Sequence, residues 1–164
     1  MDIETLKVPK KLQPVTLWVH PEGRVTGGIY LREHSPNHAG SEYPLEVLNQ
    51  GEFFLVFKRD NPDEIRFYNL RSVIRVEYQF EGAHLGGEIT TLHCRLQMMD
   101  GSLIEGTIQE SLPTDRSRLL DYLNKKEDGF IKVHMEDDLV YLINKAYIIH
   151  VHVMEMHDSG FSAE

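Results

Sequence analysis

The chain has few of the residues that would assign it to a specialised class of protein. It contains one cysteine, Cys94, among 164 residues, so an internal disulfide framework is excluded and a reducing compartment is expected. No run of about 18 apolar residues occurs, which argues against a membrane-spanning helix. The N-terminus lacks the apolar core of a secretion signal. We therefore expect a cytoplasmic, bacterial-type protein without a membrane partner.

Positive charge is scarce, and most of the deficit falls in the second half. Residues 81–164 carry 7 Lys or Arg against 15 Asp or Glu, whereas residues 1–80 carry 10 against 11. An acidic surface repels phosphates and anionic lipids. The net charge of −9 thus lowers the expectation of nucleic-acid binding.

Patterns that indicate catalysis are also missing. No Ser/His/Asp, Cys/His or glycine-rich phosphate-binding arrangement has the right context, and the carboxylates are scattered. Cys94 occupies the position that Val15 has in an earlier similar stretch, which indicates a small buried side chain rather than a nucleophile. The sequence therefore predicts neither an enzyme nor a cofactor.

What the chain does contain is an internal repeat. PLEVLNQGEFFLV (44–56) is similar to RLLDYLNKKEDGFIKV (118–133), and a gap of two residues places Phe53 on Phe130. The similarity continues upstream, where Gly27 falls on Gly106, and downstream, where NLRSVIRV (69–76) falls on NKAYIIHV (144–151). We interpret this as one β-rich unit of about 65 residues used twice.

Alternation of apolar and polar residues predicts five short strands in each unit, with a helical turn between the second and third. Strands are expected at 15–20, 24–31, 53–58, 65–68 and 72–80, and at 92–98, 103–110, 130–135, 139–143 and 147–154, with helical residues at 45–49 and 116–126. The paired Gly27 and Gly28 indicate a bulge or sharp bend.

The predicted fold is therefore mainly β, with two tandem five-stranded small barrels or rolls. The first unit with an N-terminal arm covers residues 1–80, a glycine-rich linker 81–90, the second unit 91–156 and a disordered tail 157–164.

The motif E-G-T-I (105–108), followed by R-L-L-D-Y-L-N (118–124) and F-I-K-V (130–133), resembles an uncharacterised bacterial small-β-domain family with a G-x-I…R-L-x-D-Y-L-N…F-I core. The resemblance covers residues 94–153, and it reaches the first unit only through the repeat. There Glu46 replaces the aspartate, Val47 replaces the tyrosine and Pro44 stands near the arginine. The family implies no specific activity.

Each unit also resembles the Sm-like and SH3-like barrels. Sm-like proteins carry an aspartate and an asparagine after the second strand, and the asparagine helps to bind an RNA base. The resemblance makes Asp121 and Asn124, with Glu46 and Asn49 in the first copy, candidate ligand-binding residues. The structural interpretation is favoured: Asp121 would satisfy backbone amides, and Asn124 would take a left-handed conformation at a helix end. The Arg-Gly of the Sm RNA-binding loop is missing.

Two further groups of residues are candidates for function. His150, His152 and His157 have a spacing usable for zinc or nickel, although the favoured interpretation is that they fill the solvent side of a strand, as Arg75 does in the first copy. The favoured interpretation also places Ile149, Val151 and Val153 on the core side.

Three residues of the first predicted hairpin form the second group. Trp18, His20 and Tyr30 fall on nominally outward positions, where an exposed tryptophan is unusual. They would form an interface between the units, an oligomer contact or a peptide-binding surface.

The leading functional prediction is a non-enzymatic protein-interaction or assembly module that binds through open strand edges. Its partner would be another protein or further copies of the chain in a homo-oligomer. The alternatives are an Sm-like RNA or nucleotide binder that uses Asp121 and Asn124, and a metal-binding accessory protein that uses the C-terminal histidines.

Overall fold

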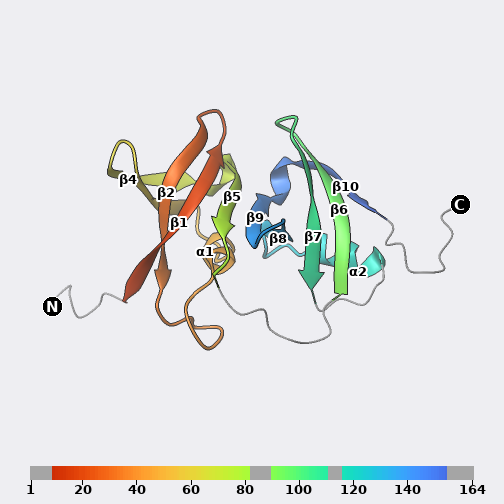
Figure 1. The fold of residues 1–164 in the computed structure, drawn as a ribbon, viewed down its shortest axis with the longest axis horizontal. Coiled ribbons are helices and arrows are strands. Elements are labelled where there is room, and N and C mark those ends of the chain that lie inside the picture. The colour runs from red at the N-terminus through yellow and green to blue at the C-terminus, as the bar shows by residue number, and fades with distance from the viewer. Residues whose placement is uncertain (1–8, 82–89, 111–115, 155–164) are drawn as a thin grey trace, which may run out of the picture. The chain divides into compact units, whose positions relative to one another are not determined.

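The computed structural model describes residues 9–81, 90–110 and 116–154, and it is mainly β (Figure 1). The described chain divides between Val76 and Glu77 into two compact units. Most of the predicted linker and the predicted tail lie outside the described residues. Within the described part, no helix has the length and apolar character needed to cross a membrane.

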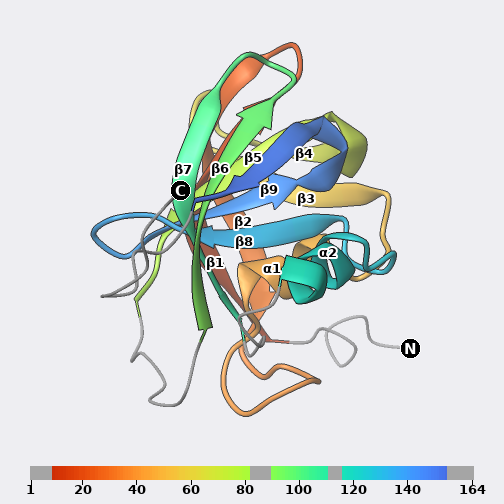
Figure 2. The same cartoon turned by 90° about the vertical axis from the view of Figure 1, so that its right-hand side faces the viewer.

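Unit 1 has five strands and two short helical segments. The strands of unit 1 follow the antiparallel order β5-β1-β2-β3-β4, so β4 lies at one end of this order. Helix α1 lies against β2 (Figure 2). The elements are β1 (Lys10–Val19), β2 (Gly23–Arg32), α1 (Pro44–Leu48), β3 (Phe54–Arg59), β4 (Glu64–Asn69), the 3-10 turn η2 (Leu70–Ser72) and β5 (Val73–Gln79).

Unit 2 has the same elements in the same order. Its antiparallel strand order is β10-β6-β7-β8-β9, so in both units the fifth strand neighbours the first. The elements are β6 (Thr90–Met98), β7 (Leu103–Glu110), α2 (Arg116–Leu123), β8 (Phe130–His134), β9 (Leu139–Asn144), η3 (Lys145–Tyr147) and β10 (Ile148–Val153).

The predicted mainly-β class and the predicted elements are confirmed, with β1 beginning earlier, at Lys10. The finer prediction, two five-stranded small barrels or rolls, is not confirmed. The described pairings stop at β4 in unit 1 and at β10 in unit 2, and no strand in the described ranges pairs with the outer edge of either. The sheet is open at these two strands.

The glycines of the second strand in each unit are explained by close backbone approach. A Cβ at Gly27 would collide with the Lys58 carbonyl, and a Cβ at Gly106 would come within 2.8 Å of the His134 carbonyl. The pairing of β1 with β2 runs past Gly27 without a register shift, so the predicted bulge is absent. Glycine is needed at both positions because the third strand of the unit crosses there.

Strand pairing corrects one part of the repeat alignment. Phe54 lies opposite Asn69, and Phe130 lies opposite Asn144, the asparagine that begins the corresponding 3-10 turn. Phe54 rather than Phe53 is therefore the counterpart of Phe130. The alignment erred because the loop between helix and strand has different lengths in the two units, and the apolar pair Phe53–Phe54 fits in either register.

The core of each unit follows from strand alternation. Cys94 lies opposite Gly106, as Val15 lies opposite Gly27, and both side chains are buried. Burial raises the pKa of the Cys94 thiol to about 11, so at neutral pH it is a protonated, apolar group. Side chains that are less than 2% exposed include Leu17, Ile29, Phe57, Val73 and Val76 in unit 1 and Leu96, Met98, Ile108, Ile131 and Val133 in unit 2.

Candidate functional site

One side of the β3–β4 hairpin of unit 1 exposes large apolar side chains. Val56 lies opposite Phe67, and Lys58 lies opposite Ile65, so these residues share one side of the hairpin. Exposure is 57% for Phe54, 44% for Val56, 46% for Ile65 and 69% for Phe67. We call these four residues the β4 face. The alternate residues of the same strands turn inward and form the core, so the hairpin is apolar on both sides.

Backbone groups of β4 are available beside this face. The Leu70 amide donates to the Phe53 carbonyl at 2.9 Å. Because hydrogen-bonded pairs alternate along an antiparallel ladder, Tyr68 and Arg66 also direct their backbone groups toward β3. Ile65 and Phe67 therefore direct theirs to the outer edge, where no described strand pairs with them.

A pocket of about 280 Å³ adjoins the face. Phe54 and Val56 line it together with Tyr30, whose side chain is half-buried. Lys10 and Arg32 place positive charge in its lining, and Glu42 and Glu52 place negative charge there. Glu42 is 6% exposed, and its carboxylate accepts a hydrogen bond from the Arg32 amide at 3.0 Å. The pocket thus has an apolar side that is continuous with the β4 face and a mixed-charge remainder.

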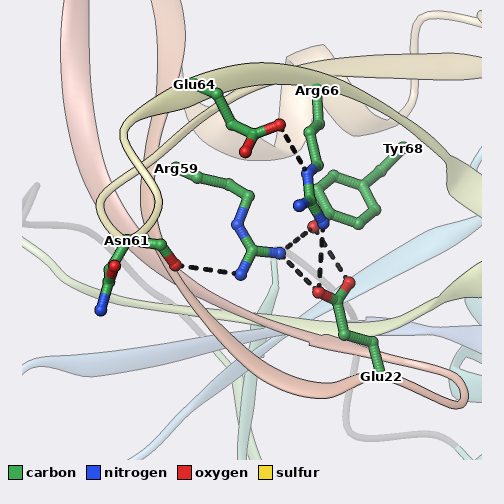
Figure 3. Close-up of polar contacts among 6 residues, drawn as sticks. All are labelled: Glu22, Arg59, Asn61, Glu64, Arg66 and Tyr68. Carbon is green, nitrogen blue, oxygen red and sulfur yellow. Dashed lines mark hydrogen bonds and ion pairs between the residues drawn. The ribbon is translucent and has the colours of Figure 1, made fainter.

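An ionic cluster holds the other end of this hairpin (Figure 3). The Glu22 carboxylate, in the β1–β2 turn, accepts hydrogen bonds from the Arg59 guanidinium at 2.5 Å and the Tyr68 hydroxyl at 3.0 Å. The Arg66 guanidinium reaches Glu22 at 3.4 Å and Glu64 at 3.2 Å. Arg59 also donates to the Tyr68 hydroxyl, at 2.7 Å.

Charge pairing decides the ionisation of this cluster. Burial alone would raise the pKa of Glu22, but the hydrogen bonds from Arg59 and Tyr68 and the nearby charges lower it. No sequence motif indicates the cluster, because its members lie up to 46 residues apart. It fixes the β3–β4 hairpin that carries the apolar face against the β1–β2 turn.

The side chain of Glu46, a candidate ligand-binding residue in α1, forms hydrogen bonds with the loop that precedes this helix. Its carboxylate accepts hydrogen bonds from the Tyr43 amide at 2.5 Å and the Ser35 hydroxyl at 2.7 Å. The Asn37 amide and the His38 ring nitrogen also contact it, both at 2.9 Å. Burial would raise the pKa of Glu46, yet these hydrogen bonds outweigh burial and lower the pKa from 4.5 to about 2.

His38 completes this loop. Its ring stacks on Tyr43 with centroids 4.2 Å apart, and the Ala39 carbonyl and Glu46 raise its pKa. Asn49 follows the helix as its C-terminal cap, and its amide donates to the Leu45 carbonyl at 3.0 Å. Glu46 and Asn49 therefore close a loop and end a helix, and the Glu46 side chain is only 17% exposed.

The second-copy pair, Asp121 and Asn124, is exposed. The Asn124 amide donates to the Leu120 carbonyl at 2.9 Å, and its backbone is not left-handed, so that part of the expectation is wrong. The helix end is closed by Lys145 instead, whose ammonium donates to the carbonyls of Leu123 and Lys125, both at 2.8 Å. Burial lowers the pKa of Lys145. Asn144 and its counterpart Asn69 cap the 3-10 turns, as expected of tight-turn residues.

Two of the C-terminal histidines, His150 and His152, lie on the strand at the open edge of unit 2. His150 and His152 are exposed on β10, while His157 lies outside the described residues. Within the described ranges, no three metal-ligating side chains gather. A register shift between Ile148 and His150 turns Ile149 outward, at 58% exposure, so the expectation that Ile149 faces the core is wrong.

Trp18, His20 and Tyr30 do not form one surface. The strand register places Trp18 opposite Arg24 and Tyr30 opposite Leu12, at different ends of the hairpin. The Arg75 guanidinium covers the half-buried Trp18 ring at 4.5 Å, and Arg75 is only 9% exposed. Arg75 therefore does not fill the solvent side of β5, as the sequence had suggested.

Comparisons with known proteins add no family to this description. No family model matches the chain, and no curated protein or solved structure is significantly similar to it. The function must therefore be argued from the surface itself.

Proposed function

We propose that the protein is a non-enzymatic interaction module whose unit 1 binds another polypeptide along the β4 face and the edge of β4. The observation that carries the proposal is the exposure of Ile65 and Phe67, 46% and 69%, on a strand whose outer edge has no partner in the described ranges. An open edge offers backbone hydrogen bonds, and the adjacent apolar side chains offer burial. Full burial contributes roughly 1.5–3 kcal/mol for each such side chain.

The corresponding strand of unit 2 supports this interpretation. Val140 and Leu142 lie on β9 at the positions of Ile65 and Phe67, and they are 1% and 0% exposed. Apolar residues at these positions are thus suited to being covered. In unit 1 the corresponding residues, Ile65 and Phe67, are also apolar, but they are not buried in the described structure.

We further propose that the two units are copies of one small-barrel-like roll that arose by duplication. The shared strand order, with the fifth strand beside the first, and the asparagine-capped 3-10 turn between the fourth and fifth strands support this proposal. The crossing glycines, Gly27 and Gly106, support it independently.

A site-specific photo-crosslink tests the proposed function. A benzophenone amino acid at position 67 of the full chain, irradiated in host cells, is expected to form covalent adducts with a polypeptide. The matched control places the same amino acid at Met99, which is 60% exposed on the β6–β7 turn. Absence of adducts at position 67, or equal adducts at both positions, would overturn the proposal.

A further inference from the structure

Two strands of the chain are exposed where their counterparts in the other unit are buried. The first is β4, whose Phe67 is 69% exposed while Leu142 is 0% exposed. The second is β10: its Ile149 is 58% exposed, whereas Ile74, the counterpart on β5, is 6% exposed. Strand β3 adds one such difference at its first residue, because Phe54 of the β4 face is 57% exposed while its counterpart Phe130 is 3% exposed. At matched core positions of the first strands, Leu17 and Leu96 are both 0% exposed.

β10 also carries an open backbone edge. The Met154 amide donates to the His93 carbonyl at 2.9 Å, so the backbone groups of His152, two residues earlier, also point toward β6. Val151 and Val153 therefore direct their amides away from β6. No described strand pairs with this side of β10. The chain thus has two open edges, one at each of the two strands that lack cover.

Unit 2 contains a model for how such a hairpin is covered. Residues 77–81 belong to unit 2, and there the Phe80 amide donates to the Asp138 carbonyl at 2.9 Å. The Gln79 side chain donates to the Asp137 carbonyl. The Lys132 ammonium, on the side of β8 that faces Leu142 across the ladder, lies 5.4 Å from the Phe80 ring centroid. An extended segment therefore lies along the β8–β9 hairpin.

The repeat identifies the counterpart of that segment. The 3-10 turns place Asn69 on Asn144, and the same offset places Gln79 on Met154. The end of β5, which together with Phe80 lies along the β8–β9 hairpin, thus corresponds to the end of β10. Its counterpart surface in unit 1 is the β3–β4 hairpin.

We infer that the β4 face binds the open edge of β10 in a second copy of this chain, so that copies associate head to tail. This inference rests on the proposed function and names its partner. The two surfaces differ, so the contact is heterologous, and repetition closes into a ring or continues as a filament. Charge favours it over contact between two copies of unit 2, because residues 81–164 carry 7 basic against 15 acidic residues while residues 1–80 carry 10 against 11.

The test is the native mass of the full chain by light scattering, for the wild type and two edge variants. Phe67→Glu places a charge on the β4 face, and Val151→Pro removes an outward amide of β10 while leaving its bonds to β6. The wild type is expected above the monomer mass of 19.0 kDa, and each variant alone is expected as a monomer. Met99→Glu, a charge at an exposed site elsewhere, is expected to keep the wild-type mass.

Mixing the two variants makes the test directional. Phe67→Glu retains an intact β10, and Val151→Pro retains an intact β4 face, so an equimolar mixture is expected to form a one-to-one dimer and nothing larger. Circular dichroism confirms that each variant is folded, and Ile65→Glu serves as a second β4 variant if Phe67→Glu unfolds.

Three results would overturn the inference: a wild-type monomer at every concentration tested, a Phe67→Glu variant that still associates, or a mixture that stays monomeric. The photo-crosslink at position 67 separates these failures from failure of the proposed function. Adducts with a different polypeptide would retain the interaction module and discard self-association, whereas no adducts would remove both.

Discussion

The two units place the same elements in the same order, and they differ in which strand is left uncovered. In unit 1 the fourth strand exposes Ile65 and Phe67, and in unit 2 the fourth strand buries Val140 and Leu142. The fifth strands show the reverse, with Ile74 buried and Ile149 exposed. Exposure of apolar residues at these two positions is therefore found on β4 and not on β9. Exposed apolar surface of this kind supports the proposal that β4 is a binding surface.

The units also differ in how the segment around the helix is held. Unit 1 uses the Glu46 carboxylate, which accepts hydrogen bonds from the loop between β2 and α1. Unit 2 closes its helix from the other end, with Lys145 bound to the carbonyls of Leu123 and Lys125. The counterpart of Lys145 is Leu70, which is 9% exposed. The same position therefore contributes burial in one copy and charge-assisted hydrogen bonds in the other.

A large effect is expected at the crossing glycines, where substitution should destabilise both units. Gly27→Ala directs a methyl group into the Lys58 carbonyl and the Phe57 ring, and we expect a loss of about 3 kcal/mol in the free energy of unfolding. Gly106→Ala approaches the Val133 side chain at 2.5 Å and the His134 carbonyl at 2.8 Å, which is less close than the approach at Gly27, so about 2 kcal/mol is expected. Urea unfolding measures both. Equal stability of Gly27→Ala and the wild type would break the claim that the third strand crosses there.

The effect on stability of removing the carboxylate should differ more between the units at Glu46 and its counterpart Asp121. For Glu46→Ala we expect a loss of about 2 kcal/mol, because four donors lose a charged acceptor, whereas Asp121→Ala at the exposed counterpart should change stability by less than about 0.5 kcal/mol. Urea unfolding of both variants at neutral pH provides the measurement. Similar losses for the two would show that Asp121 has a structural role equal to that of Glu46.

The lowered pKa of Glu46 predicts that the stability of the protein depends on pH. The pKa of Glu46 is about 2 in the folded protein and ordinarily 4.5, so its contribution to stability is present above pH 4.5 and is lost as the pH falls toward 2. We expect the difference in unfolding free energy between the wild type and Glu46→Gln to shrink across this window. If the difference in unfolding free energy between the two proteins stayed at about 2 kcal/mol from pH 5 to pH 2.5, the ionised Glu46 carboxylate would not be the source of the stabilisation.

Lys145→Met tests the other arrangement. Two carbonyl oxygens at the end of α2 lose their donor, and a loss of about 1–1.5 kcal/mol is expected in urea unfolding. Lys126→Met changes an exposed lysine in the loop that follows α2, so it serves as the control and should leave stability nearly unchanged. If both variants were equally stable, the helix end would not depend on Lys145.

The smallest expected effect on stability is at the β4 face itself. Phe67→Glu should change the unfolding free energy by less than about 0.5 kcal/mol, because the side chain is already 69% exposed. Leu142→Glu, at the buried counterpart, should prevent folding or cost more than about 4 kcal/mol. Thermal unfolding compares the two. A large loss at Phe67 would mean that this residue belongs to the core of unit 1.

The sequence predicted the elements well because alternation and turn residues are local signals. The third strand shows the limit of such signals: Phe54 and Val56 are as apolar as their neighbours Leu55 and Phe57, and the pattern indicates a strand apolar on both sides without showing which side is covered. Strand periodicity also cannot show which edges remain open. The sequence therefore predicted barrels or rolls with open edges without showing that β4 and β10 are the strands left open.

The candidate sites were predicted less well, since they depend on contacts between distant segments. The Glu22 cluster joins two turns, and the loop around Glu46 joins a helix to residues before it, so neither produces a sequence motif. Glu46 was found through the repeat, which gave its position but not its use. Ile149 was misplaced because one bulge reverses the orientation of a strand residue.

Hydrogen exchange of the outward amides tests the central claim most directly. The amides of Ile65 and Phe67 on β4 and of Val151 and Val153 on β10 can be followed by NMR in dilute and concentrated samples of the full chain. The account predicts that all four become protected together as the concentration rises and that none becomes protected in the Phe67→Glu variant. Fast exchange of these amides at both concentrations, with the rest of the sheet protected, would contradict it.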